Sequence, residues 1–139
     1  MRRTKVLFVC IGNACRSQMA EGFARTYGSD VLEVDSAGLM PASMIPEVTR
    51  HVMAEKGIDL ADQYPKDVQD VRLHDVDLVV NLSGLSLRGL PITHAREWKV
   101  KDPMGEKESF HREVRDRVER LVMDLILEMR TQPPSRLTQ

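Results

Sequence analysis

The feature that most constrains this chain is a buried-strand pattern that runs into a tight turn and then into a helical pattern. Residues 6–10 form a continuous apolar run rich in β-forming side chains, which is typical of a central strand covered on both faces. From Ser17 the apolar positions fall at helical spacing, and Gly28 supplies a C-terminal stop. The first unit is therefore predicted to be strand, turn and helix.

The same alternation continues along the chain and predicts an α/β fold. Further strands are expected at 31–36, 77–82 and 93–100, and helices at 46–56, around 67–73 and over the apolar stripe of 110–129. Strands that alternate with helices indicate a parallel sheet with helices on both faces, which makes three layers. Such sheets bind ligands at the carboxyl ends of their strands.

Composition fits a single domain. The 139 residues are 42% apolar and 29% charged, which suits one compact core. We expect the domain to occupy 1–131, and 132–139, which contains Pro133 and Pro134, to be a flexible tail. Lys and Arg total 20 against 21 Asp and Glu, so neither nucleic acid nor a membrane surface is an expected partner.

Cysteine usage points to a reducing compartment. Cys10 and Cys15 are the chain's 2 cysteines, and they lie in one segment where they cannot cross-link distant parts of a fold. The basic start followed by an apolar run imitates a secretion signal, but the run stops at Gly12 after about six residues, which is too short. No apolar stretch approaches the roughly 18 residues of a membrane span. We therefore expect a cytoplasmic protein.

The loop between the first strand and the first helix is predicted to bind an anion. Residues 10–17 read Cys-Ile-Gly-Asn-Ala-Cys-Arg-Ser, and backbone N–H groups in such a loop point inward beside the positive end of the helix. Gly12 and Asn13 suit the left-handed conformations that the loop needs, and Arg16 offers a planar fork to two anion oxygens. The predicted anion-binding residues are Ile11, Gly12, Asn13, Ala14, Cys15 and Arg16.

Cys10 stands at the mouth of this electropositive loop, which favours the nucleophilic thiolate form. Ser17 can donate a hydrogen bond to that thiolate. A lone cysteine at the end of a buried strand is usually inert, but the arginine and the strand-to-helix placement favour a reactive one. Asp102 follows the fourth expected strand, so it falls at the same edge of the sheet and can serve as a general acid, although an Asp-Pro pair alone is commonly a turn.

At these residues the sequence resembles the low-molecular-weight protein tyrosine phosphatase family, which also contains the thioredoxin-coupled arsenate reductases. The resemblance covers the 10–17 loop, the Ser-Ala-Gly of 36–38, the Asp-Leu-Val-Val of 77–80 and the Asp-Pro of 102–103. It implies a single α/β domain whose four-stranded parallel sheet has the order 2-1-3-4, with the catalytic domain over 1–131.

The resemblance also implies roles for individual residues. Cys10 would be the nucleophile, Arg16 the clamp on the transition state, and Asp102 the acid and then the base. Asn13, Ser17 and Ser36 would order the loop and tune the thiolate. No metal or organic cofactor is implied, and the four scattered histidines have no metal-ligand spacing.

Two departures separate the functions within that family. Residues 13–22 are similar to the reductase branch, and Gln18 stands where the phosphatases usually carry proline. Met104 and Gly105 replace the aromatic residues with which the phosphatases wall the phosphotyrosine ring. However, the reductases use two further cysteines after the third strand, and 81–91 contains none.

The two activities differ in whether they need electrons. Reduction needs two electrons, which would come through Cys15 or an external thiol, whereas hydrolysis needs none. The sequence therefore favours a phosphomonoester hydrolase that forms a phosphocysteine on Cys10. Arsenate reduction on the same loop is the alternative, and a non-catalytic phosphate-binding regulator is a remote third. The expected substrate is a phosphorylated protein, a small phosphate ester or arsenate.

The sequence allows two roles for each of two further residues, Cys15 in the loop and Trp98. Cys15 is close enough to form a reversible disulfide with Cys10, and an inert packing thiol is equally open. Trp98 is interpreted as a packing residue, with a place at the mouth of the site as the alternative.

Overall fold

The computed structural model describes residues 2–131 and contains one parallel sheet of four strands in the order β2-β1-β3-β4. The strands are β1 (Thr4–Cys10), β2 (Leu32–Gly38), β3 (Leu78–Asn81) and β4 (Ala95–Glu97). The helices are α1 (Arg16–Tyr27), α2 (Glu47–Ala54) and α3 (Glu108–Thr131), with 3-10 turns η1 (Val68–Asp70) and η2 (Leu73–Asp75). The predicted fold class and strand order are confirmed.

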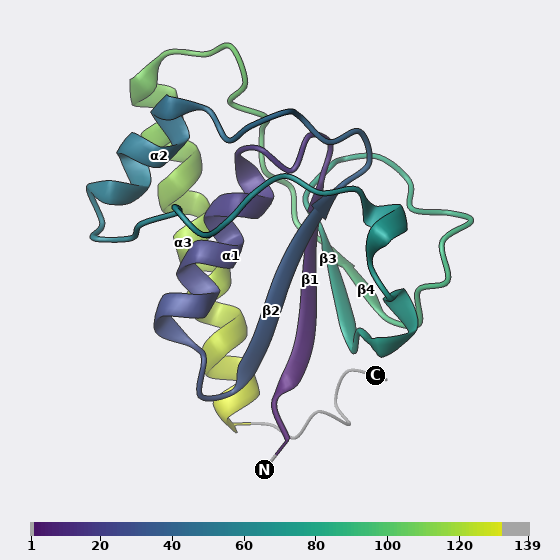
Figure 1. Ribbon diagram of the computed structural model, residues 1–139. Helices are drawn as coiled ribbons and strands as arrows, with labels where there is room; N and C mark the ends of the chain where they lie inside the picture. Colours follow the sequence, from purple (N-terminus) through teal and green to yellow (C-terminus); the bar gives the residue numbers. More distant parts are fainter. Residues whose placement is uncertain (1, 132–139) are drawn as a thin grey trace.

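The two faces of the sheet are covered differently (Figure 1). The three α-helices lie on one face, where Phe8 of β1 packs into a cluster with Phe23 of α1 and Val122 of α3. The 3-10 turns lie on the other face, where Leu7 and Val9 of the same strand join a smaller cluster. Both faces of β1 are therefore buried, which explains its unbroken apolar sequence.

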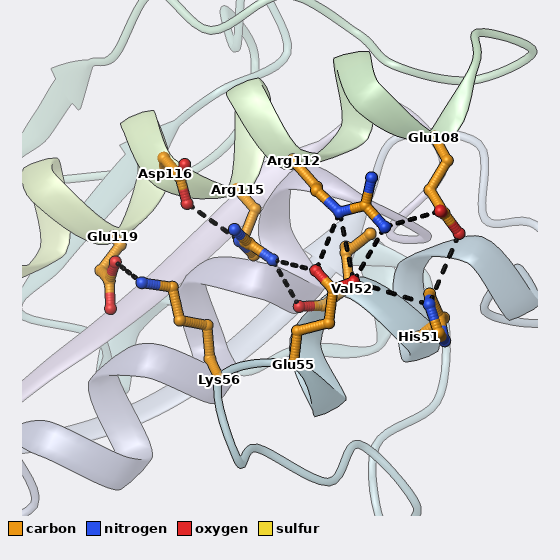
Figure 2. Close-up of polar contacts among 9 residues, drawn as sticks. All are labelled: His51, Val52, Glu55, Lys56, Glu108, Arg112, Arg115, Asp116 and Glu119. Carbon is orange, nitrogen blue, oxygen red and sulfur yellow. Dashed lines mark hydrogen bonds and ion pairs between the residues drawn. The ribbon is translucent and has the colours of Figure 1, made fainter.

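Helix α2 is attached to α3 by a network of charged side chains (Figure 2). Glu55, just after α2, accepts hydrogen bonds from Arg112 and Arg115 of α3, the shortest at 2.8 and 2.6 Å. His51 lies 3.6 Å from both Glu55 and Glu108. This network fixes α2 in place, and α2 in turn borders the loop that follows β1.

Three expected elements differ from the structure. The fourth strand is shorter than 93–100 because the chain leaves the sheet after Glu97, and Val100 turns inward to a buried position. The helix expected around 67–73 is replaced by η1 and η2. The tail predicted at 132–139 lies outside the described residues. Within 2–131, no helix is both long enough and apolar enough to cross a membrane.

Candidate active site

The loop that joins β1 to α1 presents its backbone N–H groups without partners. Two of its carbonyl groups accept hydrogen bonds from the segment that follows β2: Met40 N donates to Ile11 O at 2.8 Å, and Ala42 N donates to Gly12 O at 2.8 Å. No N–H of residues 11–15 donates a hydrogen bond to any group in the described chain. Helix α1 also begins without a side-chain cap or an acidic residue in its first turn. An anion is the partner that such unsatisfied donors require.

Asn13 gives the loop its sharp turn. Its φ of 49° is the one positive φ among the non-glycine residues of 2–131. The side chain holds this conformation, because Oδ1 accepts from Lys66 N at 2.9 Å and Nδ2 donates to Ser17 Oγ at 2.7 Å. Gly38 closes the back of the loop, where a Cβ would lie 2.8 Å from both Asn13 N and Ile11 O. A larger residue at 38 would therefore push the loop out of place.

Cys10 and Ser17 are in direct contact. The distance between Cys10 Sγ and Ser17 Oγ is 2.9 Å, and both side chains are buried. Because Ser17 Oγ already accepts a hydrogen bond from Asn13, its own hydroxyl proton is available to the sulfur. This arrangement stabilises a negative charge on Cys10 Sγ.

Arg16 lies between the loop and the carboxyl ends of β3 and β4. Its side chain is buried, and Nη1 donates to Leu82 O at 2.6 Å and to Val100 O at 3.1 Å. Nη2 lies 3.5 Å from Asp102 Oδ2. Nε is buried and has no hydrogen-bond partner among residues 2–131. A buried donor without a partner is costly, and an oxyanion in the loop would satisfy it.

A small cavity of about 130 Å³ lies at the centre of these groups. One water molecule in the liquid occupies roughly 30 Å³, so the cavity is about four times as large. It can hold a tetrahedral oxyanion and little more. Asp102 lies at its mouth with a side chain 47% exposed, and Oδ1 accepts from Met104 N at 3.0 Å. The lining residues are Cys10, Ile11, Gly12, Ala14, Cys15, Arg16, Asp102 and Met104.

The sequence matches a family model named low molecular weight phosphotyrosine protein phosphatase over residues 5–135. This chain belongs to that family. Among its relatives, the glutaredoxin arsenate reductase of Synechocystis is 37% identical over 126 residues, which is 88% of this chain and 95% of the relative. The arsenate reductase of Bacillus subtilis is 36% identical over 128 residues, 85% of this chain and 91% of the relative.

A solved structure shows the same relationship in three dimensions. An arsenate reductase in its phosphate-binding state superposes with a TM-score of 0.83 at 35% sequence identity. The match covers 91% of this chain and 98% of that one. This phosphatase-family chain therefore resembles the arsenate reductase members, as residues 13–22 indicate, and its segment 81–91 contains no cysteine.

The preference for phosphoester hydrolysis is wrong in the light of these comparisons. The relatives described above, which cover 85–91% of this chain at 35–37% identity, are arsenate reductases. The preference gave too much weight to the missing cysteines of 81–91, since two thiols from outside the protein can supply both electrons. The cavity agrees with the reversal, because Met104 lines it and no aromatic ring among residues 2–131 does.

Ser36 is placed differently from the expectation for this family. Its hydroxyl donates to Glu21 Oε1 at 2.5 Å and makes no hydrogen bond to the 10–17 loop. The Ser36 side chain does not reach the loop because it points from β2 toward the second turn of α1, where Glu21 lies. Burial raises the pKa of Glu21 above its usual range. The Ser36 carbonyl accepts from Lys66 Nζ at 3.0 Å, and Lys66 N in turn donates to Asn13 Oδ1 of the loop at 2.9 Å.

Cys15 is held as a neutral thiol. The side chain is 3% exposed, and Thr49 of α2 donates a hydrogen bond to its sulfur at 3.3 Å. Burial raises the pKa of Cys15 to about 11. The thiolate is therefore scarce at neutral pH, which makes Cys15 a poor nucleophile. Both cysteines are free thiols in the structure.

Sequence reasoning missed the segment that braces the loop from the side. Gln18 Nε2 donates to Asn13 O at 2.9 Å and to Tyr64 O at 3.1 Å, and Gln63 Nε2 donates to Gln18 Oε1 at 2.8 Å. Together with Lys66, these contacts attach 63–66 to the loop. The one signal in the sequence is Gln18 itself, which stands where the phosphatases usually carry proline, and the structure shows that its side chain is fully buried.

Trp98 packs against Phe8, with ring centroids 5.9 Å apart, so its body is part of the core as expected. No group of three His, Cys, Asp or Glu side chains in the described part of the chain could hold a metal ion.

Proposed function

We propose that this protein is an arsenate reductase that works through Cys10 and takes its electrons from an external thiol. The observation that carries the proposal is the 37% identity to a glutaredoxin arsenate reductase across 95% of that relative. The anion loop supports it, since the unsatisfied donors around Cys10 suit arsenate as well as phosphate.

The first step forms a bond between sulfur and arsenic. Arsenate enters the loop, where the N–H groups of 11–15 and Arg16 Nε supply donors for its oxygens. The Cys10 thiolate, with Ser17 donating to it, attacks arsenic. One oxygen leaves as water after it takes a proton, for which Asp102 at the mouth of the cavity is the proposed donor.

The second step moves two electrons to arsenic. An external thiolate attacks the Cys10 sulfur, a disulfide bond forms between the two sulfurs, and the electron pair of the sulfur–arsenic bond passes to arsenic. Arsenic(V) becomes arsenic(III) and leaves as arsenite. A second thiol then reduces the mixed disulfide and restores Cys10. In total, one arsenate and two thiols give one arsenite, one disulfide and one water.

Cys15 takes no part in this proposal. Its pKa of about 11 leaves the buried sulfur protonated at working pH, so it attacks the Cys10 adduct more slowly than an external thiolate. We further propose that the catalytic domain occupies 1–131 and that the protein works in the cytoplasm, where small thiols are kept reduced.

The direct test is arsenite formation from arsenate with the purified protein and a reduced thiol. We expect arsenite to form at a rate that depends on the thiol concentration, and Cys10→Ser to abolish it. The matched control is Cys15→Ser, which should still form arsenite. Absence of arsenite with every thiol, together with rapid hydrolysis of p-nitrophenyl phosphate, would overturn the proposal.

A further inference from the structure

The reaction needs a place for the external thiol, and the cavity around Cys10 is too small to be that place. Its volume of about 130 Å³ is filled by the oxyanion. Pockets that enclose a ligand of several hundred daltons measure roughly 300–1,000 Å³. The thiol must therefore be held outside this cavity and extend only its sulfur toward Cys10.

A larger cavity adjoins the far side of Arg16. Its volume is about 500 Å³, and it lies where the chain leaves β3 and β4. Leu82 and Val100 belong to its lining, and their carbonyl groups are the two that hold Arg16 Nη1. Lys101 also lines it and is followed directly by Asp102 of the catalytic cavity. The full lining is Asn81, Leu82, Gly84, Glu97, Trp98, Lys99, Val100 and Lys101.

The walls of the larger cavity are preformed. Trp98 N donates to Asn81 O at 2.9 Å, and Arg117 Nε of α3 donates to Lys99 O at 2.9 Å. Together with the Arg16 contact to Val100, these bonds anchor three successive residues of the 97–101 segment. A segment fixed in this way loses little further entropy when a ligand binds.

The charges in the cavity have no partners of their own. Lys99 and Lys101 form no ion pair with any carboxylate of residues 2–131, whereas Arg16 and Arg96, which lie close to this segment, are paired with Asp102 and Glu128. Glu97 accepts one hydrogen bond, from Asn81 Nδ2 at 2.9 Å, and has no cationic partner in the described chain. Two exposed cations and one exposed anion in a single cavity match a ligand that carries carboxylates and an ammonium group.

We propose that this cavity binds the electron donor, and that the donor is a small thiol peptide with carboxylate and ammonium groups. The inference rests on the proposed function. Lys99 and Lys101 bind the carboxylates and Glu97 binds the ammonium, while the thiol extends past Asp102 toward Cys10. The bound thiolate attacks the Cys10 sulfur of the arsenic adduct, so the mixed disulfide forms with the peptide still held in the cavity, and arsenite leaves with the electron pair.

Binding can be measured without any chemistry, because Trp98 lines the cavity and is the chain's 1 tryptophan. S-methylglutathione carries the charges of a thiol peptide but cannot react. Titration of the Cys10→Ser protein with it should change Trp98 fluorescence to saturation. Lys99→Gln and Lys101→Gln should each weaken binding about fivefold, which is the strength of one exposed ion pair, and high salt should weaken it further.

The matched control is Lys107→Gln. Lys107 is an exposed lysine in the connection between β4 and α3. It does not line the cavity and forms no ion pair within 2–131, so its variant should bind S-methylglutathione as the parent does. In the catalytic assay, Lys99→Gln and Lys101→Gln should raise the ratio of KM for glutathione to KM for uncharged 2-mercaptoethanol, and Lys107→Gln should not.

The inference would be overturned if Trp98 fluorescence did not respond to S-methylglutathione, or if the Lys99, Lys101 and Lys107 variants bound it equally well. Binding of an acidic redox protein in place of the small peptide would overturn it as well. Failure of the proposed function has a different signature, because no thiol, charged or uncharged, would then support arsenite formation.

Discussion

The reactivity of Cys10 depends on a chain of three contacts that starts well away in the sequence. Lys66 N holds Asn13 Oδ1, Asn13 Nδ2 holds Ser17 Oγ, and Ser17 thereby directs its proton to Cys10 Sγ at 2.9 Å. Hydrogen bonds to a charged group are worth about 1.5–3 kcal/mol, so the last contact matters most. Ser36, which the family resemblance groups with Asn13 and Ser17, bonds to Glu21 instead.

The pair Ser17→Ala and Ser36→Ala separates these roles. Ser17→Ala should slow iodoacetamide alkylation of Cys10 at neutral pH and lower kcat/KM for arsenate by about 10- to 100-fold, because the thiolate loses a charge-assisted donor. Ser36→Ala removes a hydroxyl of the same kind that does not contact the loop, and should leave the alkylation rate of Cys10 close to that of the parent. Equal slowing by both variants would show that Ser17 acts only through general packing.

At the scale of elements, α2 matters because it carries Thr49, whose hydroxyl donates to the sulfur of Cys15 in the loop. The ionic network of Figure 2 keeps α2 against α3, and Glu55 is its centre. The hydrogen bonds from Arg112 lower the pKa of Glu55 to about 2, against an opposing effect of desolvation and with help from Arg115. A folded-state pKa below the ordinary value of 4.5 means that the ionised form stabilises the fold.

This shift predicts a pH dependence of stability. The Glu55 contribution is complete above about pH 4.5 and is lost as the pH falls toward about 2, because the carboxylate becomes protonated. In urea unfolding at pH 7, Glu55→Gln should therefore be less stable than the parent, and the difference should shrink at pH 3. Glu113→Gln is the control, since Glu113 lies exposed on α3, between the two arginines that bind Glu55, and forms no ion pair in the described chain. A difference that is constant with pH would contradict the assignment.

At the scale of the whole molecule, the site is assembled where four segments meet at the carboxyl edge of the sheet. The 10–17 loop follows β1, 38–42 follows β2, Leu82 follows β3 and 100–104 follows β4. At this edge, the N–H groups of the loop and Arg16 Nε have no hydrogen-bond acceptor in the described chain, and a bound oxyanion would supply one. The anion is thus coupled to the stability of the fold.

Phosphate or arsenate should stabilise the protein in thermal unfolding. At about 100 times its dissociation constant, a ligand that binds only the folded state adds about 2.7 kcal/mol. Arg16→Lys should remove most of this gain, because an ammonium group cannot reproduce the planar fork. Chloride at equal ionic strength is the control and should give no comparable gain. A shift that persists in the Arg16 variant would place the anion elsewhere.

Much of this edge could be predicted from local patterns. The apolar run of 6–10, the change of period at Ser17 and the turn residues before it predict β1, the loop and α1, because strand, turn and helix signals are short-range. Other features depend on tertiary contacts. The bracing by Gln63 and Lys66, the direction of Ser36 and the early end of β4 follow from packing between distant segments. The lack of cysteine in 81–91 could not decide between hydrolysis and arsenate reduction, because it does not show whether a thiol from outside the protein supplies the electrons.

In the proposed cycle, Cys10 is the one residue of this chain that exchanges electrons with an external thiol. Intact-mass spectrometry tests it after the protein has reacted with arsenate and limiting glutathione and has been quenched with acid. We expect one glutathione attached to Cys10 in the parent and in Cys15→Ser, and none without arsenate. A product that has instead lost two hydrogens, with Cys10 joined to Cys15, would show that the electrons come from within the chain and not from an external thiol.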